Sequence, residues 1–225
     1  MCGRYAITMP VEAMVRLFDA VPSNDLPPTP NYNVTPTSPV HSVRLAGEGG
    51  GRRLVAMRWG FIPHWYKTPN DGPLLINARS ETVATKPAFR DAARKRRCLL
   101  PASGFYEWTA GEGGRRLPWY VRPASDEPIA FAGIWQEWQG EGVDAPLATV
   151  AIVTAPAGNA LSAIHDREPV IIHPADHALW LGEAGKGAAR LMRPQPDGFW
   201  TFYRVSTRVN SNRANGPDLI APIDG

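Results

Sequence analysis

The chain has 225 residues, which is enough for one sizeable hydrophobic core and too short to make two domains the default. Hydrophobic residues make up 44% and charged residues 20%, as in ordinary soluble globular proteins, and no apolar run approaches the ~20 residues of a membrane span. The net charge of +3 tolerates an anionic partner without demanding one. We therefore expect a single domain over residues 1–225, monomeric and cytoplasmic, with no membrane segment and no signal peptide.

The first elements predicted along the chain are a short helix and a proline-rich loop. Apolar residues recur on one helical face at Val11, Met14, Val15 and Phe18. The segment 22–39 then contains six prolines and is expected to run over the surface as an extended loop.

Glycine-rich turns separate several strand-like runs. Residues 47–51 lie between the runs 40–45 and 54–58, and residues 111–114 lie between 105–109 and 117–122. Such spacing predicts antiparallel hairpins with extended tips. Further strand-like runs cover residues 129–135, 147–154, 169–172 and 199–205, with another glycine-rich turn at 140–142.

Two more helices are predicted, one from Pro87 through Arg97 and one from Pro174 to Gly182. Strands and helices do not alternate regularly, which argues against a doubly wound parallel sheet. The sequence predicts an α+β fold class, a β-rich single domain with mostly antiparallel strands in barrel-like sheets and a few flanking helices.

The chain begins Met-Cys-Gly-Arg, and a small second residue normally allows Met1 to be removed. Cys2 would then carry a free α-amine and a thiol, with reference pKa values of roughly 7.7 and 8.5. An amine condenses with an aldehyde to an imine, and the thiol closes onto the imine carbon as a thiazolidine, a ring closure favoured by effective molarities on the order of 10⁵ M. Two alternatives stay open: a buried structural Cys2, and a thiol nucleophile like that of amidotransferases.

Longer motifs follow in order over nearly the whole chain: Trp59-Gly-Phe-Ile-Pro-His-Trp65, Asn77-Ala-Arg-Ser-Glu-Thr82, Arg97-Cys-Leu-Leu-Pro-Ala-Ser-Gly-Phe-Tyr-Glu-Trp108, His165-Asp-Arg-Glu-Pro-Val-Ile172, and Val205-Ser through Val209-Asn to Pro217-Asp-Leu-Ile220. With the N-terminal Met-Cys-Gly-Arg-Tyr, they make the chain resemble the SOS response-associated peptidase (SRAP) family. Members of that family shield abasic sites in DNA by DNA–protein crosslinking. Beyond the first three residues we find no resemblance to amidotransferases.

The resemblance implies a covalent thiazolidine between Cys2 and the ring-opened deoxyribose of an abasic site in single-stranded DNA, with lyase-type chemistry and autoproteolytic removal of Met1. It implies catalytic roles for Cys2, Asn77, Glu107 and His165. The resemblance, together with the basic and aromatic composition, also suggests residues that contact DNA. They are Arg4, Arg79, Arg167, Trp65 and, by its spacing before His165, Thr154.

One position departs from the family pattern. Glu168 stands where the family usually has methionine, so a carboxylate follows Arg167 directly. We expect it to weaken the phosphate contact of Arg167 or to hold that side chain in place.

The same residues also have a physical interpretation. Glu107 lies between Tyr106 and Trp108, whose apolar surroundings would raise its pKa toward neutrality and suit it to shuttle protons. His165 is the natural partner for opening the sugar because histidine titrates in the relevant interval. Without the resemblance, Glu107 would be assigned to a strand surface, His165 to a hydrogen-bonded core position and Asn77 to a turn or cap.

Binding to single strands is expected from arginines on phosphates, which makes binding salt-dependent, and from one or two tryptophans on flanking bases. The candidates for stacking are Trp59, Trp65 and Trp108. The basic run 94–97 either neutralises the end of the second helix or extends a positive groove.

We expect no metal or other cofactor. His173 and His177 have the spacing of helical zinc ligands, but the accompanying glutamate pattern is absent and Pro174 lies between them. Cys98 is expected to be a buried strand residue with a free thiol. Two other functions remain as alternatives: a peptidase or amidase with Cys2 as nucleophile, and a noncatalytic single-strand-binding module.

Overall fold

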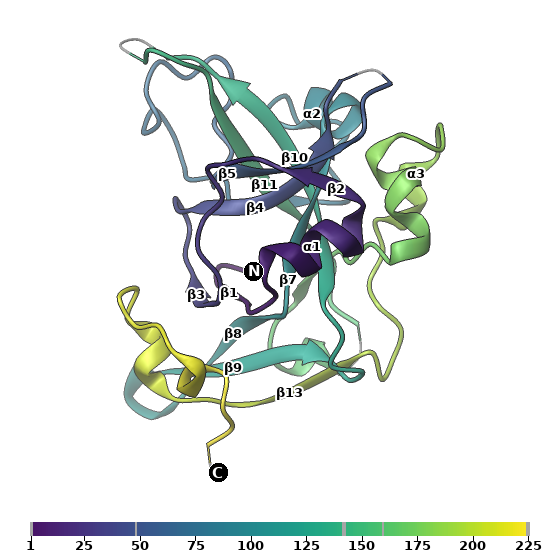
Figure 1. The fold of residues 1–225 in the computed structure, drawn as a ribbon. Helices are drawn as coiled ribbons and strands as arrows, with labels where there is room; N and C mark the ends of the chain where they lie inside the picture. Colours follow the sequence, from purple (N-terminus) through teal and green to yellow (C-terminus); the bar gives the residue numbers. More distant parts are fainter. Residues whose placement is uncertain (1, 48, 141–142, 159, 224–225) are drawn as a thin grey trace.

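The computed structural model describes residues 2–47, 49–140, 143–158 and 160–223, and Figure 1 shows its ribbon. The α-helices are α1 (Val11–Phe18), α2 (Arg90–Lys95) and α3 (His177–Leu181). The strands are β1 (Tyr5–Ile7), β2 (Ala20–Pro22), β3 (Asn31–Val34), β4 (Pro39–Leu45), β5 (Arg52–Trp59), β6 (Asn77–Arg79), β7 (Arg97–Ala102), β8 (Gly104–Ala110), β9 (Arg116–Pro123), β10 (Ile129–Trp138), β11 (Leu147–Pro156), β12 (Arg167–Pro169) and β13 (Trp200–Arg204). Short 3-10 turns connect several of them.

The larger sheet closes into a barrel. Its path runs β12–β11–β10–β7–β4–β5–β2, and β11 also pairs in parallel with β5, at Thr149 with Arg58 and Val150 with Trp59. The strands β5, β4, β7, β10 and β11 therefore form a ring, and β6 pairs in parallel with β11 farther along that strand, at residues 152–154. A closed ring leaves these strands no unpaired edge.

The smaller sheet has the order β13–β9–β8–β1–β3 and is antiparallel throughout. In Figure 1 its strands β8, β9 and β13 lie below the barrel. The two sheets share one core, because Tyr5 of β1 packs edge-on against Trp59 and Phe131 of the barrel at centroid distances of 5.3 and 5.6 Å. Such edge-to-face pairs add to the free energy of simple apolar burial. The chain start is thereby held between the two sheets.

Most of the predicted elements are confirmed, as is the α+β, β-rich fold class. The hairpins β4–β5, β8–β9 and β10–β11 are antiparallel, as their glycine-rich turns indicate; the turn at 140–142 falls partly outside the described residues. Helix α1 matches the apolar pattern and buries Met14 and Phe18. A 3-10 turn at Pro174–Asp176 leads into α3, which ends at Gly182 with φ of 100°, a value that glycine adopts without strain.

Two predicted elements have different bounds in the structure. The helix expected from Pro87 through Arg97 runs only from Arg90 to Lys95, and it stops short of Arg97 because Arg97 pairs with Ile134 and begins β7. The strand expected over 169–172 is β12, three residues long, followed by a single bridge between Ile171 and Phe131.

The proline-rich segment 22–39 is only partly the surface loop that the sequence predicts: residues 23–30 form no helix or strand and none of them is buried. It contains β3, in which Asn33 and Val34 are buried. Val34 pairs with Tyr5 of β1. This pairing with a distant strand makes residues 31–34 a strand, although the neighbouring prolines favour a loop.

Candidate active site

The pairing of β1 with β8 sets the position of Cys2. Tyr5 lies opposite Phe105, and the backbone N–H of Tyr106 donates to the carbonyl of Arg4 at 2.9 Å, which continues this pairing beyond β1 toward the chain start. Antiparallel register therefore brings residues 2 and 3 alongside Glu107. Cys2 is fully buried there.

Two further contacts fix the surroundings of Cys2. Asn77, the first residue of β6, donates from its Nδ2 to the Cys2 carbonyl at 2.9 Å. Burial, together with the negative charge of Glu107, raises the pKa of the Cys2 thiol. The thiol is therefore held in its protonated form and needs a base to become nucleophilic.

Glu107 is also a buried titratable group, with an exposed fraction of 3%. Its position on β8 between Tyr106 and Trp108 takes it out of water, and this desolvation raises the pKa of its carboxyl, while the charge of His165 acts in the opposite direction. The rise in the Glu107 pKa that its apolar neighbours predict is therefore confirmed. The alternative assignment of Glu107 to an exposed strand surface is wrong. Cys2, Glu107 and His165 thus interact electrostatically.

His165 follows a 3-10 turn at Leu161–Ala163 and has a side chain that is 26% exposed, so it is not a core histidine. Its Nδ1 accepts the backbone N–H of Arg167 at 2.9 Å and lies 3.0 Å from Oδ1 of Asp166. The two contacts require different protonation states of Nδ1. When Nδ1 accepts from Arg167, the neutral ring carries its proton on Nε2; when the ring is charged, Asp166 becomes the partner of Nδ1.

An open cleft of about 690 Å³ lies over these groups, lined among others by Gly3, Glu107 and His165. Trp108 forms part of its wall, and the guanidinium carbons of Arg116 and Arg4 lie 4.8 and 5.8 Å from the centre of the indole. Cationic and aromatic groups on one wall suit a ligand that carries both anionic and planar parts.

Three polar contacts hold Arg4 in this wall, one from β3 and two from residues 209–212. It donates to Oδ1 of Asn33 at 2.7 Å, to the Val209 carbonyl at 2.8 Å and to Oδ1 of Asn212 at 2.6 Å. A guanidinium fixed in this way is preorganised to present its charge to an anion.

Arg167 lies beneath the surface rather than on it. It is 7% exposed, donates from Nη2 to the Thr154 carbonyl at 2.6 Å, and forms a two-pronged ion pair with Glu81. Glu168 was expected to affect Arg167, but it is fully buried and accepts backbone N–H groups of Gly158 at 2.9 Å and Gln195 at 2.6 Å. The carboxylate that holds Arg167 is therefore Glu81, because the Glu168 carboxylate is already occupied by these backbone donors.

The other predicted DNA-contacting residues differ in how accessible they are. Arg79 of β6 is exposed and Trp65 is 49% exposed, although neither lines the cleft. Thr154 is fully buried, so direct contact with DNA would require movement. Trp59, a candidate for base stacking, is also fully buried and donates its indole N–H to the Ile76 carbonyl, so that suggestion is wrong.

The comparison with protein families decides the assignment of the chain. The family model described as SOS response associated peptidase (SRAP) matches residues 1–212. The chain belongs to the SRAP family.

Named relatives match this SRAP protein along almost its whole length. The abasic site processing protein YoqW of Bacillus subtilis is 33% identical over 226 residues, which cover 98% of this chain and 99% of the relative. YedK of Escherichia coli, which has the same description, is 31% identical and covers 99% of this chain and 100% of its own. HMCES of Mus musculus, another abasic site processing protein, is 32% identical and matches over 100% of this chain and 76% of its own.

Solved structures share the fold. A protein from Bacteroides thetaiotaomicron superimposes with a TM-score of 0.83 at 20% identity, covering 99% of this chain and 100% of its own. A phage-related protein from Bordetella bronchiseptica superimposes with a TM-score of 0.72 at 27% identity, covering 95% and 99%. The arrangement of the two sheets is therefore that of known proteins.

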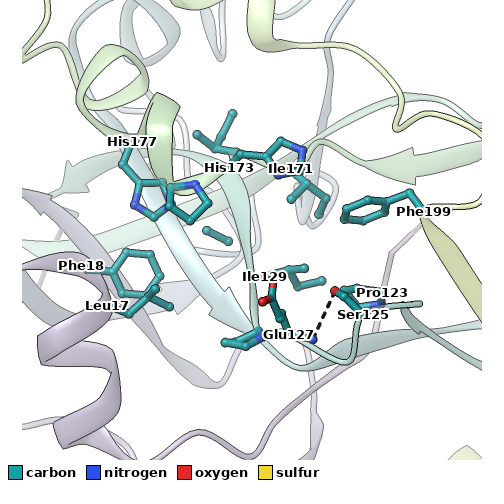
Figure 2. A pocket seen from close by; sticks show the side chains of 14 residues that line it. Leu17, Phe18, Pro123, Ser125, Glu127, Ile129, Ile171, His173, His177 and Phe199 are labelled. Carbon is teal, nitrogen blue, oxygen red and sulfur yellow. Dashed lines mark hydrogen bonds between the residues drawn. The ribbon is translucent and has the colours of Figure 1, made fainter.

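A separate pocket of about 280 Å³ in the SRAP chain contains both His173 and His177, as Figure 2 shows. The two rings do not converge on a shared point: His177 stacks on Phe18 at 5.1 Å, and His173 bonds to Oε1 of Gln195 at 2.9 Å. Within the described part of the chain, no three metal-ligating side chains cluster. Nor is any helix in that part long and apolar enough to span a bilayer.

Sequence reasoning missed several groups around the SRAP site. Glu81 lies in a motif that was recognised, but its pairing with Arg167 was not. Asn33 was hidden in the proline-rich segment, and Arg116 and Asn212 carry no motif. These residues reach the site only in the folded chain, so the local sequence held no signal for them.

Proposed function

We propose that the protein is an abasic-site processing enzyme that binds single-stranded DNA and links its N-terminal Cys2, after removal of Met1, to the ring-opened deoxyribose as a thiazolidine. The adduct would shield the lesion. The observation that carries this proposal is that Cys2, bonded to Asn77, interacts with Glu107, and that Glu107 and His165 line one cationic cleft. The printed names of the relatives support the same substrate.

The chemistry begins with the sugar, which exists mainly as a closed hemiacetal. A proton delivered to the ring oxygen releases the aldehyde, and His165 or the protonated form of Glu107 can supply it. The raised pKa of Glu107 keeps a larger share of this carboxyl protonated at a given pH than in an ordinary glutamate.

The bond to the protein forms in two steps. The α-amine of Cys2 adds to the aldehyde carbon and water leaves, which gives an imine. The thiol sulfur then adds to the imine carbon, its proton goes to a base and the nitrogen gains one, so the ring closes with no oxidant or reductant. Because the pKa of the thiol is raised, we assign Glu107 as the base for this step.

Asn77 is assigned a positioning role. Its Nδ2 donates to the carbonyl of Cys2, which fixes the rotation of the residue that reacts. A group held close to the attack geometry reacts at a high effective concentration, so loss of this contact should slow the reaction without removing either nucleophile.

DNA is proposed to enter along the wall formed by Arg4, Trp108 and Arg116. Arginines would contact phosphates and the indole would stack on a base beside the gap. We propose that Arg79 and Trp65 extend this surface. Arg167, held by its ion pair with Glu81, is proposed to support it.

Intact mass spectrometry with an abasic single-stranded oligonucleotide tests the proposal directly. It reports removal of Met1 and the DNA adduct in one spectrum. Wild type should give an adduct whose mass is the sum of both molecules less one water. Cys2→Ala should lose the stable thiazolidine, whereas Cys98→Ala, which changes the other buried cysteine, should retain it.

Cys2→Ser separates the two nucleophiles. It retains the amine but not the thiol, so it should give an adduct that survives only after borohydride reduction. A stable adduct formed by protein that retains Met1, or one that is unaffected by Cys2→Ala, would refute the chemistry. Hydrolysis of peptides or glutamine without a DNA adduct would favour the peptidase alternative, and equal binding of intact and abasic strands without an adduct would favour a noncatalytic binding module.

A further inference from the structure

A second groove, of about 600 Å³, lies between α2 and α3 and shares no lining residue with the candidate active site. Its floor is apolar and includes Ile134, Leu181 and Ala188. Its rim carries four cationic residues: Arg94, Lys95, Arg97 and Lys186. No lining residue among those that the structure describes is acidic, so the groove has an uncompensated positive charge.

The nearby carboxylates do not neutralise this rim. Glu183 on the α3 side is committed to Arg52 at 2.7 Å, and Asp91 on α2 lies 4.0 Å from Arg90. In the described residues, no ion pair joins Arg94, Lys95 or Lys186 to an acidic side chain. These three residues are exposed, and their charges face solvent.

Arg97 is the part of the rim that the fold itself holds in place. Its Nη1 donates to the carbonyls of Ala93 and Arg94 at 3.0 and 2.8 Å, and its Nε donates to the Trp180 carbonyl. Its Nη2 lies beside Gly182, where a Cβ would be only 3.2 Å away. The absence of a side chain at Gly182 leaves this nitrogen accessible from the groove.

We propose that this groove binds an acidic segment of a partner protein, with its carboxylates on the rim cations and an apolar side chain on the floor. Charge complementarity favours an anionic partner. A single-stranded nucleic acid fits less well, because Trp180 is the only aromatic residue among the described lining residues and is 1% exposed, which leaves no ring face for bases to stack on. Aliphatic floor residues instead suit a leucine or isoleucine side chain.

Fluorescence anisotropy can test this proposal with a labelled peptide of alternating aspartate and leucine. We expect saturable binding to wild type that weakens with added salt, since charge attraction across a solvent-exposed rim is screened. The peptide with asparagine for aspartate, or with serine for leucine, should bind at least about tenfold more weakly, a loss of about 1.4 kcal/mol.

Variants then locate the site on the protein. The triple substitution Arg94→Glu, Lys95→Glu and Lys186→Glu should weaken the acidic peptide by about tenfold or more. The matched control reverses three exposed cations that do not line the groove, Arg16→Glu, Arg53→Glu and Lys67→Glu. Far-ultraviolet circular dichroism and melting temperature verify that both variants remain folded.

Three outcomes would overturn the proposal: no binding of the acidic peptide to wild type, equal loss in the control variant, or retention by the triple variant. A fourth would replace it. If an unmodified single-stranded oligonucleotide, rather than the peptide, loses affinity in the triple variant, the groove extends the DNA surface instead. Because the peptide assay uses no abasic DNA, its failure is separate from any failure of the proposed crosslinking.

Discussion

At the scale of single residues, the candidate site combines two groups that burial keeps in their neutral forms. The pKa values of the Cys2 thiol and the Glu107 carboxyl are both raised, mainly by desolvation. The negative charge of Glu107 further disfavours a thiolate, so the two groups are coupled: removal of a proton from one makes its removal from the other harder. This coupling lets one proton pass between them without leaving the site charged twice.

Glu107→Gln should therefore stabilise the fold while stopping the proposed reaction. The carboxyl in the unfolded chain ionises near about pH 4.3, below its raised folded pKa, so wild-type stability falls as pH rises between these two values and stays lower above them. Glutamine does not ionise. Melting temperatures of the two proteins should be similar in acid, with the variant a few degrees higher at neutral pH.

The same variant should form the DNA adduct at least about 100-fold more slowly, the usual contribution of a general acid or base. A lower melting temperature than wild type at neutral pH would mean that the native site stabilises the carboxylate, contrary to the direction of its pKa. An unchanged rate of adduct formation would remove Glu107 from the chemistry.

Glu81→Gln should show the opposite pH dependence. The hydrogen bonds from Arg167 lower the pKa of Glu81 to about 2, so this ion pair stabilises the fold above the unfolded value near 4.3 and loses its effect as pH falls toward 2. Arg167 is buried but the Glu81 side chain is 47% exposed, so we expect a loss between the limits for buried and surface pairs, about 1–2 kcal/mol at neutral pH.

Urea denaturation of wild type and Glu81→Gln at neutral and acidic pH measures this difference. Glu137→Gln, an exposed position on β10, serves as the control and should change little at either pH. If the difference in unfolding free energy between wild type and Glu81→Gln stays constant down to about pH 2, the stabilisation does not depend on the charge of Glu81.

At the scale of elements, β8 is the strand on which the site depends, because it pairs with β1 on one side and β9 on the other. It therefore sets both the position of Cys2 and the depth of Glu107. The strand can approach β9 closely only because its first residue is Gly104. A Cβ at this position would lie 2.6 Å from the Val121 carbonyl oxygen and 2.6 Å from the Tyr120 ring.

Gly104→Ala should thus shift β8 and lower stability, by the ~1–3 kcal/mol typical of an overpacked core. Because the displaced strand carries Glu107, adduct formation should fall as well. Chemical denaturation and the crosslinking assay measure the two effects. Gly51→Ala is the matched control, since a Cβ there meets nothing within 4 Å; a similar loss of stability in both variants would contradict the argument from close packing.

At the scale of the whole molecule, the barrel depends on the parallel contact between β5 and β11, where Val150 pairs with Trp59. Trp59 is fully buried at this closure and packs on Tyr5 of the smaller sheet. The Trp59 side chain thus connects the barrel closure to β1, the strand that follows Cys2.

Trp59→Ala should cost about 3–5 kcal/mol, the usual range for removing a buried tryptophan. The half-exposed Trp65, six positions along the same motif, provides the comparison: Trp65→Ala should change stability by no more than about 0.5 kcal/mol. Thermal unfolding of both variants measures this contrast. Equal losses of stability in the two variants would mean that the packing of Trp59 at the β5–β11 contact contributes little to stability.

The three hairpins could be predicted from sequence because each consists of two strand-like runs separated by a short glycine-rich turn. The short strands β1, β3 and β6 could not, since three or four residues carry too little pattern and their partners lie far along the chain. The rise in the Glu107 pKa followed from its immediate neighbours. The pairing of Glu81 with Arg167 spans 86 positions, so only the folded chain reveals it.

The complete burial of Cys2 bears on how a reactive aminothiol could persist in a cell. A terminal cysteine in open solution would be consumed by metabolic aldehydes and by peroxide, which attacks the thiolate. Beneath the protein surface, with its proton retained, the sulfur is a poor target for such diffusing reagents. In the proposed reaction, a lesion whose phosphates are bound by the arginines of the cleft would have the residence time to reach the sulfur, which would make Cys2 selective for that lesion.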